Sequence, residues 1–119
     1  MRFMMMVKSA ENQGPPPQEL MDAMGKLVQE AIESGQMVAV GGLAPTRTSK
    51  RVRLQRGQIT VTDGPFAESK EVVGGFAIMD FDSQEKAVES ALGFMELHRK
   101  YWPNWEGTSE IRQVFGPED

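Results

Sequence analysis

The sequence lacks cysteine altogether, and it holds one histidine, one tyrosine and two tryptophans among its 119 residues. The missing cysteines exclude a disulfide framework, a thiolate nucleophile and a cysteine zinc site. A single histidine argues against a tight zinc or iron site within one chain. No apolar run approaches the ~18–20 residues that cross a bilayer, and residues 1–8 are too short for a secretory signal. We therefore expect a cytoplasmic protein without a metal, a cofactor or a membrane contact.

Positive charge is also scarce, because 13 Lys and Arg residues stand against 17 Asp and Glu residues and the net charge is −4. Nucleic-acid binding needs a clustered basic surface. One basic run is present, and it consists of Arg47, Lys50, Arg51, Arg53 and Arg56. The nearest acidic residues are Glu33 before the run and Asp63 after it, and we interpret the run as the solvated face of a hairpin rather than as a polyanion site. No nucleic-acid partner is expected, and the length predicts a single domain over residues 1–119.

What the chain does contain is a regular alternation of apolar patterns. These predict, in chain order, a strand (2–8), a helix (18–34), a strand (37–43), a hairpin (51–54 and 59–62), a strand (72–81), a helix (82–98) and a strand (109–115). Gly57 is expected at positive φ in the hairpin loop, and Asp82 is expected to cap the second helix with Glu85 in a capping box. Without the hairpin the order is βαββαβ. The predicted fold class is therefore α+β, a ferredoxin-like sheet with two helices on one face and an inserted β-hairpin.

The predicted strands carry apolar residues on both faces, as in the run Phe3 to Val7. Two helices cover only one face of such a sheet, and an antiparallel sheet tolerates a bare face when that face is polar. A second copy of the chain, sheet against sheet, would cover the other face. We therefore expect a homodimer.

Residues 62–71, Thr-Asp-Gly-Pro-Phe-Ala-Glu-Ser-Lys-Glu, are followed at once by an apolar strand with Gly74-Gly75-Phe76. Together with a Met-rich first strand, Gly41-Gly42-Leu43 and Ser109-Glu110-Ile111-Arg112, this stretch resembles the signature of the DGPF-domain branch of the YCII-related family. The resemblance implies a dimeric α+β barrel with a cleft between the sheet and the loops. It also implies an association with extracytoplasmic-function sigma factors.

For YCII proteins proper, the resemblance implies a His–Asp pair whose histidine lies in the first helix. The predicted first helix of this chain contains no histidine, so that pair does not carry over. His98 is the only alternative, and its pKa lies near neutrality in an unperturbed state. We consider two interpretations: a cation at the end of the second helix, or an acid–base pair with Asp63 or Glu68 across a cleft.

The other candidate site residues lie mostly in residues 63–71, which we call the signature loop. Asp63 either forms part of a structural turn or presents a rigidly held carboxylate at a cleft. Lys70, which lies between two glutamates, either binds an anionic group or belongs to a solvated charge cluster. The aromatic residues of 101–105 either wall a pocket or cover the helix end, and the last strand offers an arginine that could clamp a carboxylate or pair with Glu110. The candidate ligand-binding residues are Gly64, Pro65, Phe66, Glu68, Lys70, Glu71, Trp102 and Arg112.

Three functions are compatible with these patterns. The first is a dimeric small-ligand-binding or accessory domain, with a cleft between the 63–71 loop and the aromatic loop. The second is an enzyme of unknown reaction that uses Asp63 and His98, with Lys70 or Arg112 holding an anion. The third is an interaction module for a sigma factor. Because the chain has no nucleophile constellation, cofactor fingerprint or ligand cluster for a metal, the sequence favours the first.

Overall fold

The computed structural model describes residues 1–66 and 70–117 of the chain. In chain order the elements are β1 (Arg2–Ser9), α1 (Gln18–Glu33), β2 (Met37–Gly42), the 3₁₀ turn η1 (Thr46–Thr48), β3 (Lys50–Gln55), β4 (Gln58–Asp63), β5 (Val72–Asp80), α2 (Gln84–Tyr101) and β6 (Gly107–Gln113). The expected order of strands and helices is confirmed. Along the described chain, no helix is both long and apolar enough to cross a membrane.

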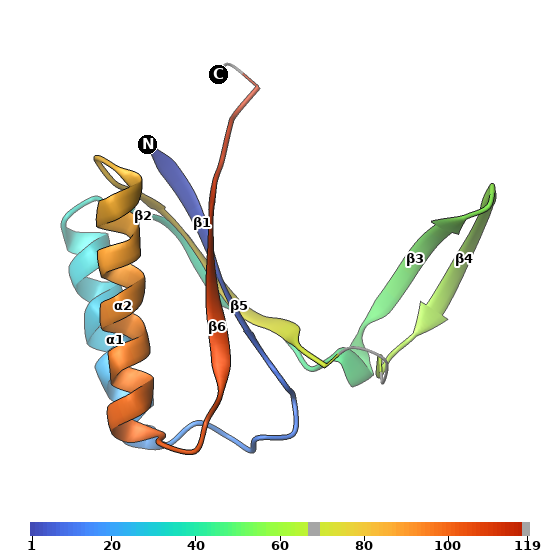
Figure 1. The fold of residues 1–119 in the computed structure, drawn as a ribbon, viewed down its shortest axis with the longest axis horizontal. Coiled ribbons are helices and arrows are strands. Elements are labelled where there is room, and N and C mark those ends of the chain that lie inside the picture. The colour runs from blue at the N-terminus through green and yellow to red at the C-terminus, as the bar shows by residue number, and fades with distance from the viewer. Residues whose placement is uncertain (67–69, 118–119) are drawn as a thin grey trace.

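Four strands form one antiparallel sheet in the order β2-β5-β1-β6. This is the order of a ferredoxin-like βαββαβ unit once β3 and β4 are set aside. Both helices lie against the same face of the sheet (Figure 1). The mixed α+β class and the one-sided placement of the helices agree with the periodicity of the sequence.

The core lies between the sheet and the helices. Large side chains come from the central strands, and Phe3 and Phe81 lie with their ring centroids 6.2 Å apart. The helices contribute small residues, Ala31, Ala87 and Ala91, which let them approach the sheet closely. Leu20 of α1 is fully buried.

The second face of the sheet is open and apolar at its centre. Met4 pairs with Ile78 and Met6 pairs with Phe76, whereas the neighbouring pair Phe3–Met79 points to the helices. Two ion pairs flank this centre, the exposed pair Arg2–Asp80 at 2.9 Å and the partly buried pair Lys8–Glu110 at 3.4 Å. We call Met4, Met6, Phe76 and Ile78 the open-face patch. These strands thus carry apolar side chains on both faces of the sheet, as the sequence predicts.

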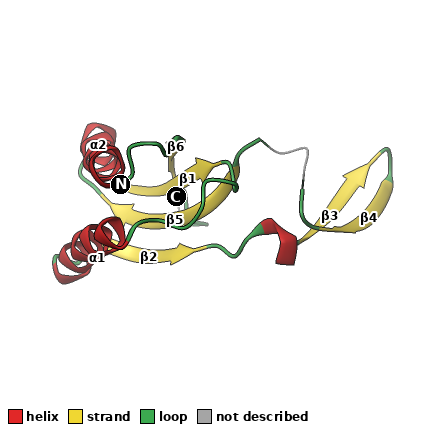
Figure 2. Ribbon diagram, turned by 90° about the horizontal axis from the view of Figure 1, so that it is seen from below, coloured by secondary structure: helices red, strands yellow, loops and turns green. Residues whose placement is uncertain are grey.

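The hairpin stands away from this body as an arm. Strands β3 and β4 pair only with each other within the described chain, and Figures 1 and 2 show them projecting from the end of β2. The radius of gyration is 16.1 Å, against about 13.5 Å for a compact chain of this length. Arg56 and Gly57 close the arm with φ of 53° and 77°, as the tight two-residue loops of hairpins require. Gly57 was expected there, but the projection of the arm was not.

The cap of α2 differs from the expectation. Ser83, not Asp82, is the N-cap, and its hydroxyl accepts from the Lys86 amide at 3.2 Å. The reason lies in Phe81, the residue before Asp82, which still forms two backbone hydrogen bonds with Met1. The Phe81 amide donates to the Met1 carbonyl at 2.8 Å, and the Phe81 carbonyl accepts from the Met1 amine at 2.9 Å. The chain is therefore still non-helical at Asp82, and the helix begins at Gln84.

Candidate functional site

The signature loop begins at the root of the arm. Asp63 ends β4 and forms an ion pair with Lys50 on β3, and both side chains are exposed. Exposed pairs of this kind contribute little to stability. Phe66 lies under the guanidinium of Arg51, whose Cζ is 3.8 Å from the ring centroid. In this position Phe66 packs against the arm rather than in the main core.

Gly64 closes the root by backbone contact. Its amide donates to the Ser49 carbonyl at 2.9 Å, and a Cβ at this position would lie 1.6 Å from the Thr46 carbonyl oxygen. Any larger residue would have to push the two segments apart. The next residue, Pro65, is exposed. The Gly-Pro step of the signature thus has a direct structural role in joining β4 to η1.

Glu11 holds the same root from the other side. Its carboxylate accepts hydrogen bonds from the Thr46 amide, at 2.8 Å, and from the Thr46 hydroxyl. These bonds lower the pKa of the Glu11 carboxyl, because they favour its charged form. The loop between β1 and α1 is therefore tied to the start of the arm.

His98 is buried at the far end of α2. Its Nδ1 lies 3.0 Å from the Phe94 carbonyl oxygen, and its ring contacts those of Phe94 and Trp105 in tilted arrangements, with centroids 4.8 and 4.5 Å apart. Trp105 in turn stacks on Trp102 at 6.0 Å. The aromatic residues therefore cover the helix end, which is one of the two interpretations that the sequence offered.

The proposed acid–base partners do not meet within one chain. Asp63 pairs with Lys50 on the arm, whereas His98 is enclosed by Phe94 and Trp105. Figure 1 places β4 and α2 on opposite sides of the molecule. An Asp63–His98 pair is thus not assembled in the protomer.

One end of the signature does reach a depression in the surface. This depression has a volume of about 480 Å³, and it lies where the β1–α1 loop, the start of β5 and the aromatic loop converge. We call it the Glu71 depression. Its lining residues are Ala10, Asn12, Gln13, Glu71, Asn104, Glu106, Gly107 and Thr108.

Hydrogen bonds between distant segments shape the Glu71 depression. The Gln13 amide donates to the Glu106 carbonyl at 2.9 Å and accepts from the Glu106 amide at 2.8 Å. The Thr108 hydroxyl donates to one carboxylate oxygen of Glu71 at 3.5 Å. Gly107 fits beneath Trp105, where a Cβ would lie 2.2 Å from the indole ring. The aromatic cluster therefore positions one wall of the depression.

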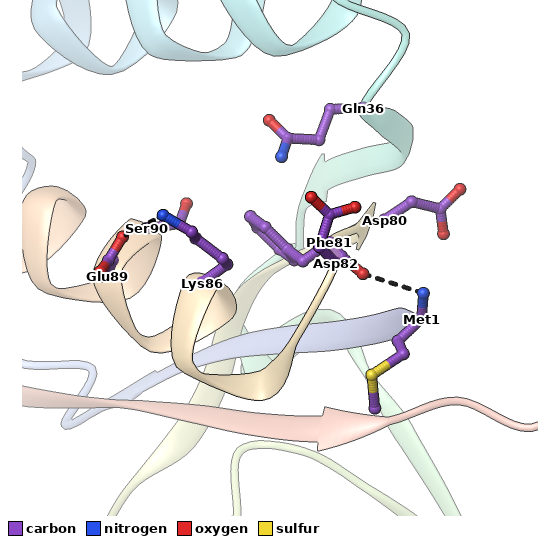
Figure 3. Close-up of a pocket in the computed structure, with 8 residues that line it drawn as sticks. All are labelled: Met1, Gln36, Asp80, Phe81, Asp82, Lys86, Glu89 and Ser90. Carbon is purple, nitrogen blue, oxygen red and sulfur yellow. Dashed lines mark hydrogen bonds and ion pairs between the residues drawn. The ribbon is translucent and has the colours of Figure 1, made fainter.

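A second hollow, of about 530 Å³, lies at the other end of the sheet. Figure 3 shows it between the start of β1, the end of β5 and the first turns of α2. The Met1 amine donates to the Phe81 carbonyl at 2.9 Å, and Lys86 pairs with Glu89 at 3.6 Å. At its rim, the Arg2 guanidinium lowers the pKa of the Asp80 carboxyl by hydrogen bonding. None of the residues singled out as site candidates lines this hollow.

Comparison with known proteins gives the family. The profile of the YCII-related domain matches residues 1–96. The chain belongs to the YCII-related family. An uncharacterized protein of Rhizobium meliloti (strain 1021) is 32% identical over 74 residues, which cover 62% of this chain and 60% of that protein.

In this YCII-related chain the family match contains the arm and the signature loop but ends within α2. The Glu71 depression therefore combines residues inside the match, such as Asn12 and Glu71, with Asn104 and Thr108 beyond it. α1 contains no histidine, so the histidine that the resemblance implies for YCII proteins proper has no counterpart in this helix. The aromatic residues of 101–105 are a sequence signal for this wall, whereas polar residues such as Asn12 and Asn104 carry no motif that marks them.

The remaining candidates are scattered. Lys70 is exposed beside Glu71, and Glu68 lies outside the described residues. Arg112 pairs in register with Met4, so it borders the open-face patch and not the Glu71 depression. Glu110, its expected partner, pairs with Lys8 instead. Within residues 1–66 and 70–117, no three carboxylate or histidine side chains gather to hold a metal ion.

Proposed function

We propose that this YCII-related protein is a dimeric small-ligand-binding or accessory domain of the DGPF branch, and that its ligand binds in the Glu71 depression. The observation that carries the proposal is the meeting of the signature with the aromatic loop at one hollow of about 480 Å³. This volume is in the range of sites for small molecules. The segments come from residues 10–13, 71 and 104–108, and hydrogen bonds of Gln13 and Thr108 join them.

The lining suggests the chemistry of the ligand. Its charged members among the described residues are two carboxylates, Glu71 and Glu106, and its amides include Asn12 and Asn104. Gln13 is occupied by the backbone of Glu106, whereas Glu71 uses one oxygen for Thr108 and keeps acceptor sites for a ligand. A small polar amine matches this surface, because it offers positive charge and several donors. An anionic ligand matches it less well.

An enzyme that uses Asp63 and His98 is less well supported. Its two groups would need to come together, and within one protomer they lie at the arm root and the end of α2. No residue of the Glu71 depression is a histidine or a lysine among the described residues. Association with a sigma factor and a place in the cytoplasm stay predictions from the sequence, and a pull-down with a sigma factor would test the former.

A titration followed by amide NMR tests the ligand site. We expect ethanolamine to shift the amide signals of residues 12–13, 71 and 104–108, because its ammonium group can pair with Glu71. Glu71→Gln removes this charge and should weaken binding by about 10-fold or more, the value of one hydrogen bond to a charged group. Ethylene glycol and glycolate, of similar size, should bind less well.

Glu89→Gln is the control, because it removes a carboxylate from the second hollow and leaves the Glu71 depression unchanged. The proposal fails when Glu71→Gln binds ethanolamine as the parent protein does. It also fails when glycolate binds more tightly than ethanolamine, or when the shifts gather around Met1 and Asp82.

A further inference from the structure

One face of the arm is apolar and open to solvent. In register, Val52 pairs with Val61 and Leu54 pairs with Ile59, so the four side chains share one side of the ribbon. Their residues are between 64% and 72% exposed. We call this quartet the arm face. The opposite side carries Arg51, Arg53, Thr60 and Thr62.

Such an arm is unusual as an isolated structure. A two-stranded hairpin alone is marginally stable in water, and it normally needs a third strand or another surface to cover its apolar side. Contiguous exposed apolar side chains typically mark an interaction surface. The arm face therefore needs a covering surface.

The body of the same chain does not provide that cover. Gly64 is fitted against the Thr46 carbonyl and bonded to Ser49, and Glu11 holds Thr46. These contacts fix the arm at its root, and both views show it pointing away from the sheet and the helices (Figures 1 and 2). The covering surface must come from another molecule.

We propose that the arm is an exchange arm, whose apolar face packs on the open-face patch of a second copy of this chain. That patch, Met4, Met6, Phe76 and Ile78, is the apolar centre of the sheet face that no helix covers. The inference rests on the dimer of the proposed function but on none of its ligand chemistry, and it places the partner's arm, in place of the partner's sheet expected from the sequence, on the open face.

Length and area are compatible with this packing. The six-residue strands of the arm span about 20 Å, whereas β1 and β5, with eight and nine residues, span about 26–30 Å. The arm is therefore short enough to lie within the length of β1 and β5, and β-sheets commonly pack face to face. Two-fold exchange uses two arm faces and two open faces, on the order of 1,000 Å² in total, which is the lower limit for a specific interface. The dimer should therefore dissociate on dilution.

Charge also favours a second copy over an anionic membrane. Segment 50–63 carries four basic residues and one carboxylate, a net charge of +3. Because the whole chain carries −4, the other residues together carry −7. The arm is therefore attracted to the body of another copy, whereas that body is repelled by anionic lipids.

Sedimentation equilibrium of the full chain tests the inference. The double variant Val52→Lys with Ile59→Lys places two charges on the arm face and should raise the dimer dissociation constant at least 10-fold. The control, Thr60→Lys with Thr62→Lys, adds the same charge on the opposite side of the same ribbon and should leave the dimer intact. Circular dichroism checks that both variants keep the fold. A monomeric parent protein, or an apolar-face variant that dimerises as the control does, overturns the inference.

Cross-linking identifies the surface that the arm covers. Because the chain has no cysteine, Ile59→Cys and Met6→Cys each introduce a single thiol. A bismaleimide should link the two variants to each other in a mixed sample, and this product should require both. Linkage of Ile59→Cys only to itself would mean that arms pair with arms. Parent protein that sediments with anionic vesicles but shows no such linkage would assign the arm face to membranes, and either result contradicts the exchange.

Discussion

At the scale of single residues, glycines decide where segments meet. Gly64 lets the end of the arm touch the Thr46 carbonyl, and Gly107 lets β6 start beneath Trp105. Gly41 lies beside Phe76, where a Cβ would be 3.1 Å from the ring. A Cβ at Gly64 or Gly107 would require the neighbouring segment or ring to shift, whereas at Gly41 a small movement of the Phe76 ring would accommodate it.

Gly64→Ala should therefore loosen the root of the arm. The new Cβ would lie 1.6 Å from a backbone oxygen that cannot turn aside, and overpacking of this kind costs about 1–3 kcal/mol. Hydrogen exchange of the amide at position 64, which is bonded to Ser49 in the parent, should become roughly 5- to 150-fold faster. Gly42→Ala is the matched control, because its Cβ would meet nothing within 4 Å. Equal exchange rates in Gly64→Ala and the parent would refute the close contact.

At the scale of elements, short polar contacts fix the connections. Glu11 joins the β1–α1 loop to η1, Gln13 joins the same loop to the aromatic loop, and Ser83 starts α2. The buried ring of His98 joins α2 to the segment that follows it. The loops around the sheet are therefore positioned by contacts between elements that lie far apart in the sequence.

The Glu11 contact predicts a pH dependence of the arm root. Hydrogen bonds from Thr46 lower the pKa of the folded-state carboxyl below its ordinary value of about 4.3. The contact therefore stabilises the root fully above that ordinary value, and the stabilisation is lost as the pH falls through the lowered pKa. The Thr46 amide signal in NMR should move in this acid range. In Glu11→Gln this movement should disappear, whereas Glu30→Gln on α1 should keep it; a pH-independent Thr46 signal in the parent protein contradicts the prediction.

At the scale of the whole molecule, the chain divides into a packed body and an outlying arm. All residues of the hydrophobic core cluster lie before residue 43 or after residue 71. The arm contributes an exposed apolar face, and the body contributes an open sheet face that is partly apolar. These are the two surfaces that the proposed exchange between two copies would bring together.

Excision of the arm tests this division. Replacing residues 50–63 by Gly-Gly should leave the body folded, because the excised segment contains no member of the core cluster. At a concentration where the parent is monomeric, the melting temperature should change by less than about 4 °C, which corresponds to under ~1 kcal/mol for a domain of this size. Loss of the dispersed amide spectrum on excision would show that the arm is part of the folding unit.

The sequence alone determined the local structure and its order. Apolar spacing predicted the strands and helices, and the Arg56-Gly57 loop predicted the hairpin, because period and turn chemistry are properties of neighbouring residues. Only the tertiary structure decided that the arm stands clear of the body, that His98 is buried away from Asp63, and that Glu71 meets Thr108. Those outcomes depend on packing and on contacts such as Glu11–Thr46, which join residues that the sequence pattern does not relate.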